Sequence, residues 1–229
     1  MSLPFYVGPE QVMQDRAEYA RKCIARGRTL VAVAHRRGVV FAAENPSRAL
    51  DKTSEVHDRI AFAAVGRYNE FESLRVAGIR LADLKALQYS REDVAVRPLA
   101  NAYAQALGAV FTGDGKPFEV ELLVAGLGRD AGDDDLELFH IRYDGSIEDV
   151  ADHVAIGGDP EPVAARLAAA WRPGLDRDAA VRVAVGVLRG EGEPAAAATD
   201  LEVSGLDAAR NGRYFFRLEV TDLAAILAA

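Results

Sequence analysis

The spacing of apolar residues changes repeatedly along this chain of 229 residues, and that alternation constrains the fold more than any single motif. Apolar residues at three- and four-residue spacing predict helices, whereas short continuous apolar runs predict strands. The predicted helices cover residues 9–26, 68–88, 92–111, 161–171 and 178–188, with a short last helix capped by Thr221. The predicted strands cover residues 29–34, 39–43, 60–65, 118–127, 136–143, 147–156, 201–206 and 214–220.

Pairs of helices therefore stand between groups of strands. Short turns such as Arg37-Gly38 and Asp144-Gly145 favour antiparallel pairing of the strands that they join. Each sheet must bury one face against the other sheet and its second face against helices. The sequence thus predicts an α+β fold, a four-layer α/β/β/α sandwich with antiparallel sheets. No linker-like segment divides it, so we expect one domain over residues 1–229, with a polar connection after Asn45-Pro46-Ser47.

Charge and cysteine content narrow the classes of partner. The chain has 27 Lys and Arg against 35 Asp and Glu, a net charge of −8, so nothing electrostatic favours binding to nucleic acid or to an anionic membrane. Cys23 is the single cysteine, which excludes an intrachain disulfide and a cysteine zinc cluster and fits a reducing compartment. No export signal precedes the first helix, and the longest uncharged stretch, residues 98–113, is too short and too polar to cross a bilayer. A cytoplasmic protein is expected.

Motifs for metal, phosphate or nucleophilic chemistry are weak. The histidines lack the spacing of paired metal ligands on one helix or turn; they are His35, His57, His140 and His153. The acidic run 130–135 lacks the glycine and the final acid of a calcium loop. The Gly157-Gly158 pair is more typical of a strand end than of a phosphate site, and no histidine is placed to activate Cys23. No cofactor and no metal are predicted.

Four motifs in order, together with the order of elements, resemble the α subunits of the 20S proteasome, most closely the actinobacterial type. They lie in residues 18–29 (EYARKCIARGRT), 38–48 (GVVFAAENPSR), 62–71 (FAAVGRYNEF) and 143–147 (YDGSI), the last leading to Gly157-Gly158. The resemblance covers nearly the whole chain. It implies the N-terminal nucleophile hydrolase fold, a four-layer sandwich that agrees with the periodicity.

The resemblance also implies that this chain is noncatalytic. Active members of the superfamily expose a threonine as residue one by cleavage after glycine, and its free amine serves as the base. Thr29 matches that position, but Arg28 precedes it and a helix lies upstream; Glu44 stands where active subunits carry aspartate. An internal Thr29 has only an amide nitrogen, which cannot take the hydroxyl proton. Two alternatives stay open: a threonine peptidase matured by cleavage before Thr29, and an unrelated acidic binding domain of similar architecture.

By resemblance, seven copies form a homo-heptameric α ring that stacks on a ring of proteasome β subunits. Residues 9–26 would be the N-terminal helix packed between neighbours, residues 29–229 the sandwich, and residues 1–8 a gate segment at the axial pore. Pro9 and Tyr19 match residues at the pore edge, although the Tyr-Asp-Arg segment of archaeal and eukaryotic relatives is absent. The gate residues carry no charge, which suits a shared axis because like charges would repel there. They are Ser2, Leu3, Pro4, Phe5, Tyr6, Val7 and Gly8.

A pocket lysine of the family receives the C-terminal carboxylate of an activator. Lys52 lies fourteen residues before Gly66, as the family pattern requires, and an ammonium suits a carboxylate. The resemblance implies an ATPase ring activator for substrates tagged in the prokaryotic ubiquitin-like protein pathway, and an ATP-independent activator as a second candidate. Lys52 is therefore the predicted activator-binding residue. On the residues alone, a solvated loop lysine is the alternative.

Overall fold

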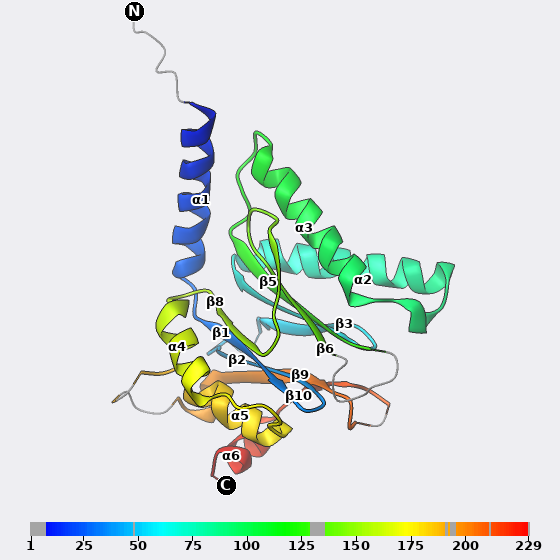
Figure 1. Cartoon of the computed structure of the whole chain (residues 1–229), viewed down its shortest axis with the longest axis vertical. Coiled ribbons are helices and arrows are strands. Elements are labelled where there is room, and N and C mark those ends of the chain that lie inside the picture. Colours follow the sequence, from blue (N-terminus) through cyan, green and yellow to red (C-terminus); the bar gives the residue numbers. More distant parts are fainter. Residues whose placement is uncertain are drawn as a thin grey trace, which may run out of the picture.

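The computed structural model describes residues 8–47, 49–128, 136–190, 192, 196–210 and 212–228. Two five-stranded sheets stack face to face, with helices on both outer faces (Figure 1). The first sheet has the order β10-β9-β2-β1-β8, and the second has the order β3-β4-β5-β6-β7. Every pairing in both sheets is antiparallel. The predicted four-layer α/β/β/α sandwich is confirmed.

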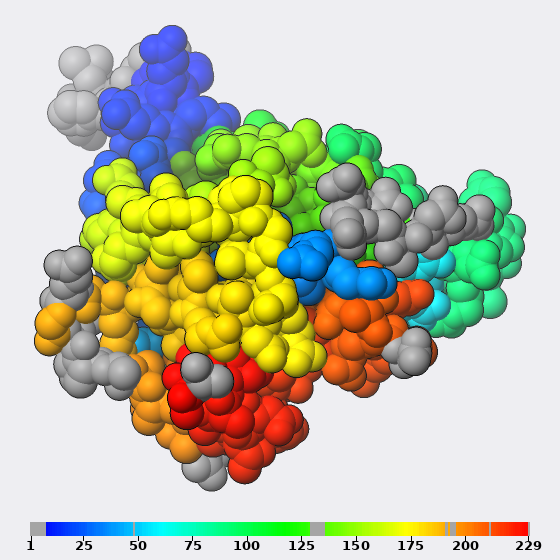
Figure 2. Space-filling view, turned by 60° about the horizontal axis from the view of Figure 1, so that its bottom comes forward, coloured from blue at the N-terminus to red at the C-terminus, as the bar shows by residue number. Residues whose placement is uncertain are grey.

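The first sheet is covered by helices from the C-terminal half of the chain. Its strands are β1 (Leu30–His35), β2 (Gly38–Glu44), β8 (His153–Ile156), β9 (Leu201–Asp207) and β10 (Phe215–Arg217). Its helices are α4 (Pro160–Ala170), α5 (Arg177–Gly186) and α6 (Val220–Ala228), with a 3₁₀ turn at Ala198–Asp200. Figure 2 shows α4 and α5 in yellow, with the blue turn between β1 and β2 emerging between α5 and the orange β9–β10 region.

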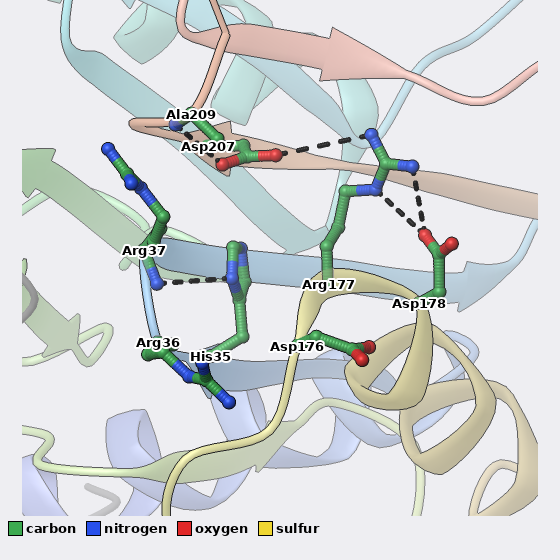
Figure 3. A pocket seen from close by; sticks show the side chains of 8 residues that line it. All are labelled: His35, Arg36, Arg37, Asp176, Arg177, Asp178, Asp207 and Ala209. Atoms are coloured by element: carbon green, nitrogen blue, oxygen red, sulfur yellow. Dashed lines mark hydrogen bonds and ion pairs between the residues drawn. The ribbon is translucent and has the colours of Figure 1, made fainter.

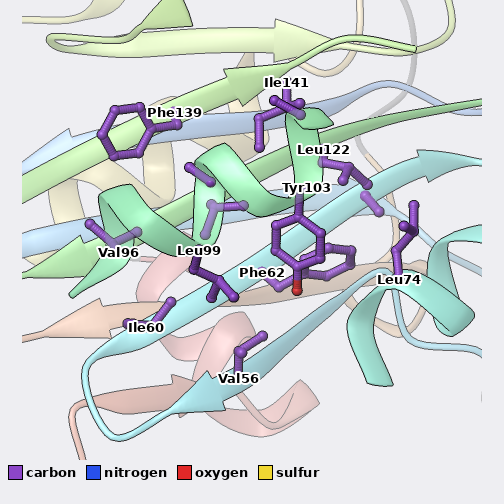
Figure 4. Packing of buried hydrophobic residues seen from close by; sticks show 14 of the residues in the cluster. Val56, Ile60, Phe62, Leu74, Val96, Leu99, Tyr103, Leu122, Phe139 and Ile141 are labelled. Carbon is purple, nitrogen blue, oxygen red and sulfur yellow. The ribbon is translucent and has the colours of Figure 1, made fainter. Parts of the chain in front are cut away.

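The second sheet is covered by two long helices. Its strands are β3 (Thr53–His57), β4 (Ile60–Gly66), β5 (Val120–Leu127), β6 (Leu136–Ile141) and β7 (Ile147–Asp149). Its helices are α2 (Tyr68–Gln88) and α3 (Val96–Thr112), joined through a 3₁₀ turn at Arg91–Asp93. The buried aromatic rings of Phe62 on β4 and Tyr103 on α3 meet at 5.6 Å between centroids in the layer between sheet and helices (Figure 4).

Buried residues form three apolar clusters, one for each boundary between layers. One lies between the second sheet and α2 and α3, one between the two sheets, and one between the first sheet and α4, α5 and α6. Strands buried on both faces are apolar at nearly every position, and β1, β2 and β4 show this pattern. Continuous apolar runs therefore predicted these strands correctly.

Three predicted elements were wrong in detail. The connection after residue 47 contains β3. This strand was not predicted because its polar residues Thr53, Ser54 and Glu55 leave no apolar run. Residues 147–156 are two strands in different sheets: β7 pairs with β6, and β8 pairs with β1. Helix α3 begins at Val96 instead of residue 92, because Pro98 has no N–H and fits only within a first helical turn.

Helix α1 (Pro9–Ala25) stands apart from the four layers. Pro9 occupies its first position, and the carbonyl of Gly8 accepts a hydrogen bond from the amide of Val12 at 3.1 Å. Only Ala20 and Ile24 are buried, both in the C-terminal half, so the N-terminal half projects beyond the sandwich (Figure 1). The predicted gate residues 2–7 lie outside the described residues; Gly8 is the described end of that segment.

Candidate functional site

Lys52 lies in a small hollow at the end of the sandwich where α1 meets β1. The hollow measures about 160 Å³ and combines an apolar wall with the lysine. Its lining comes from the α1–β1 connection, the loop between β2 and β3, the end of β4 and the start of α2; it includes Gly27, Arg28, Leu50, Val65, Gly66 and Phe71. The Nζ atom of Lys52 donates to the carbonyl oxygen of Arg28 at 3.2 Å. Lys52 and Gly66, which are fourteen residues apart in sequence, thus line the same hollow.

The ammonium of Lys52 has a lowered pKa. Burial lowers its pKa from 10.5 to about 8; the Glu202 and Glu44 carboxylates act in the opposite direction, and the Arg28 charge adds to the lowering. At neutral pH the group is mostly charged and partly shielded from solvent. A negatively charged ligand atom would replace lost hydration, which is the physical requirement for a carboxylate site.

The residue that holds Lys52 in place, Glu202 on β9, was missed by sequence reasoning. Glu202 is 7 % exposed, and its carboxylate accepts hydrogen bonds from the amides of Lys52 at 3.0 Å and Thr53 at 2.9 Å. Glu202 lies 150 residues away from Lys52 in sequence, within a strand of mixed polar and apolar residues that carries no recognisable motif. Only the pairing of β9 with β2 brings it near the lysine loop.

Thr29 lies in the chain between α1 and β1, with a peptide bond on each side. Its hydroxyl donates to the carbonyl oxygen of Gly157 at 3.1 Å. Gly158, with φ +59°, packs so closely on this hydroxyl that a Cβ there would overlap it. The arrangement seats the Thr29 side chain against the loop before α4 and leaves its nitrogen a nonbasic amide.

The acid predicted beside this corner, Glu44, is engaged in ion pairs. One carboxylate oxygen lies 2.6 Å from Nε of Arg189 and the other lies 3.5 Å from Nη1 of Arg28. Both arginine charges are thus directed at Glu44. The carboxylate has a structural partner on each side and ties the α1–β1 connection to the segment after α5.

Tyr19 joins α1 to a polar cluster at the start of β5. Tyr19 is 46 % exposed, and its hydroxyl donates to Oε1 of the buried Glu119 at 3.1 Å. This hydrogen bond raises the pKa of Tyr19. Oε1 of Glu119 also forms ion pairs with Nη1 of Arg67 at 3.2 Å and with Nζ of Lys116 at a shorter distance. Pro9, the other predicted pore-edge residue, lies at the opposite end of α1 and is not brought near Tyr19.

A second hollow, about 380 Å³, lies at the opposite end of β1 (Figure 3). Its charged lining is balanced: three arginines, Arg36, Arg37 and Arg177, face three aspartates, Asp176, Asp178 and Asp207. His35 there is hydrogen-bonded at both ring nitrogens, to the Leu206 carbonyl and the Arg37 amide. None of the residues predicted from the sequence as functional lines it. We therefore take the Lys52 hollow as the candidate site.

No cluster of three or more metal-donor side chains occurs in the described ranges, and none of their helices is long and apolar enough to cross a membrane.

Comparison with known sequences then decides the family. The family model for proteasome subunits matches residues 24–199. This chain belongs to the proteasome subunit family.

Individual relatives match all or nearly all of this chain. The chain is 52 % identical to a protein of Sanguibacter keddieii named proteasome subunit alpha, over 100 % of this chain and 91 % of the relative. It is 51 % identical to the proteasome subunit alpha of Kineococcus radiotolerans, over 100 % and 99 % of the two chains. It is also 51 % identical to that of Acidimicrobium ferrooxidans, over 97 % and 95 %. The resemblance to actinobacterial proteasome α subunits is confirmed.

Proposed function

We propose that this proteasome α subunit is the noncatalytic ring subunit that forms the gated entry to a threonine-protease chamber. The observation that carries the proposal is the continuous path from α1 through Thr29 into β1. A threonine in that path has no free amine to act as its own base. Its hydroxyl is also bound to the Gly157 carbonyl, and upstream of it α1 packs on the sandwich through Ala20 and Ile24 in its C-terminal half.

Assembly into a homo-heptameric ring is supported by the surface of α1. Val12, Met13 and Tyr19 are exposed on a helix that covers its own sandwich only at its C-terminal half. Apolar side chains on a projecting helix are suited to a neighbouring copy. At the far end of α2, Leu84, Leu87 and Tyr89 are also exposed, with Leu87 at 85 %, and they offer apolar surface to a stacked ring of β subunits.

Gating is assigned to residues 2–8, which precede α1 and carry no charge. Seven such segments would meet near one axis, where a plug of Leu, Pro, Phe, Tyr and Val side chains avoids charge repulsion. Activator docking is assigned to Lys52, with an ATPase ring or an ATP-independent ring as the activator. We place this activity in the cytoplasm, in degradation of proteins tagged through the prokaryotic ubiquitin-like protein pathway.

Co-expression with an actinobacterial proteasome β subunit tests the proposal. Native mass spectrometry should give α rings of seven times 24.6 kDa, and the α chain should keep its sequence upstream of Thr29. The particle with Thr29→Ala in α should hydrolyse peptides at the wild-type rate, whereas alanine at the β nucleophile should abolish hydrolysis. An α chain that starts at Thr29, together with loss of turnover in the Thr29→Ala particle, would establish the threonine peptidase instead.

A further inference from the structure

A buried polar network lies directly beneath the Lys52 hollow, centred on Glu202. Oε1 accepts hydrogen bonds from the Thr53 amide at 2.9 Å, the Thr53 hydroxyl at 2.5 Å and Nη1 of Arg217 at 3.0 Å. Oε2 accepts from the Lys52 amide at 3.0 Å and from Nδ2 of Asn45 at 2.6 Å. Both oxygens of one buried carboxylate are therefore surrounded by donors.

The network fixes the backbone on both sides of Lys52. Arg217 on β10 binds the Asp51 carboxylate at 3.1 Å and the Thr53 carbonyl at 2.7 Å. Asn45 binds the Leu50 carbonyl at 2.7 Å. The carbonyl of Lys52 itself accepts from the Ala64 amide at 2.9 Å. The main chain around Lys52 is thus held from both sheets, while within the described ranges its side chain donates one hydrogen bond, to the Arg28 carbonyl.

Glu202 is charged in this setting. Burial alone would raise its pKa, but the hydrogen bonds from Lys52, Thr53 and Asn45 and the Arg217 charge hold the pKa below its usual value. The same carboxylate acts on the lysine through space, where its charge favours the protonated ammonium. Glu202 therefore affects both the position of Lys52 and its charge.

We propose that Glu202 is the positioning residue of the Lys52 pocket, holding the ammonium in place and charged to receive the carboxylate of an activator tail. This inference rests on the proposed function, since it presumes that Lys52 binds that tail. Glu202 reaches no ligand itself: it is buried under the loop and acts through Lys52 and Thr53.

Glu202→Gln is the informative substitution because it keeps the shape and removes the charge. Whichever oxygen becomes the amide NH₂, that group meets at least two donors: Lys52 and Asn45 on one side, or Thr53 and Arg217 on the other. Donor facing donor cannot form a hydrogen bond, so the loop must shift. Asp207→Asn is the matched control, because Asp207 is 6 % exposed at the other end of the same strand, away from the hollow.

The test uses assembled α and β particles and a fluorescent peptide with the last residues of the ATPase ring activator, ending in a free carboxylate. Anisotropy titrations from pH 6 to 9.5 give the affinity and its pH midpoint. We expect Glu202→Gln to weaken binding at least tenfold at pH 7 and to move the midpoint below that of the wild type. Asp207→Asn should change neither. A purely structural role would leave the midpoint where it is.

Lys52→Ala particles separate the two claims. If Lys52→Ala weakens binding but Glu202→Gln leaves affinity and midpoint unaltered, the positioning role is wrong and activator docking at Lys52 stands. If Lys52→Ala has no effect, docking at Lys52 is wrong and the positioning role falls with it. Should Glu202→Gln fail to assemble, Asn45→Ala removes one donor and keeps the Glu202 charge: it should weaken binding without moving the midpoint, and wild-type binding would overturn the inference.

Discussion

The lowered pKa of Lys52 should make the proposed activator docking depend on pH in a range where an ordinary lysine does not titrate. The pKa of Lys52 is lowered to about 8 by burial. A lysine is charged below its pKa, so the attraction for a carboxylate is present at pH 7 and is lost as the pH rises through 8. About 90 % of the sites are protonated at pH 7 and about 9 % at pH 9.

If only the ammonium binds, affinity for a tail carboxylate should fall about tenfold between pH 7 and pH 9, or about 1.4 kcal/mol. The assay is anisotropy of the labelled tail peptide on assembled particles, with an amidated peptide as the ligand control. In Lys52→Ala particles the residual affinity should not vary over this range. A lysine with an unshifted pKa of 10.5 would keep nearly all its charge at pH 9. Equal wild-type affinities at pH 7 and pH 9 would therefore refute the burial argument.

Two further predictions concern assembly and stability. Deleting residues 9–26 removes α1 and uncovers the surface that Ala20 and Ile24 bury, so size-exclusion chromatography should show loss of rings; intact rings would contradict the role of α1. Gly66→Ala should lower the free energy of unfolding by at least about 2 kcal/mol, because Gly66 has φ +105° and a Cβ would overlap the Glu119 carbonyl. Gly186→Ala, which meets open space, is the control in thermal unfolding, and equal melting shifts for the two variants would count against the strain.

The layers were predictable because each of them follows from local pattern. Two-face burial makes β1, β2 and β4 continuous apolar runs, and the amphipathic stretch of α2 gave its bounds correctly at Tyr68 and Gln88. Strand β3 was not predicted because the backbone N–H of its buried Thr53 donates to Glu202, a hydrogen-bond partner that no local pattern reveals. The crossing of the chain from β7 to β8 was not predicted for the same reason. Residues 147–156 look like one strand in sequence, but strand pairing divides them between the two sheets.

The candidate site was predictable in part. Lys52 was found by its spacing to Gly66 within a family resemblance, and no property of the lysine itself distinguished it from a solvated one. Its pKa is set by burial, by the Arg28 charge and by the opposing carboxylates of Glu202 and Glu44, which lie on three separate segments of the chain. Such convergence is a property of the folded sandwich and leaves no periodic signal in sequence.

The rate at which the assembled particle degrades an unfolded protein without activator tests the central claim most directly. Residues 2–7 are removed from α, and Gly8 is kept because its carbonyl accepts the Val12 amide at the start of α1. If this segment closes the entry, degradation should rise severalfold, more for an unfolded protein than for a short peptide, and labelling of the β nucleophile by a very small inhibitor should stay the same. Equal degradation rates for truncated and full-length particles would contradict the account of this subunit as a gate.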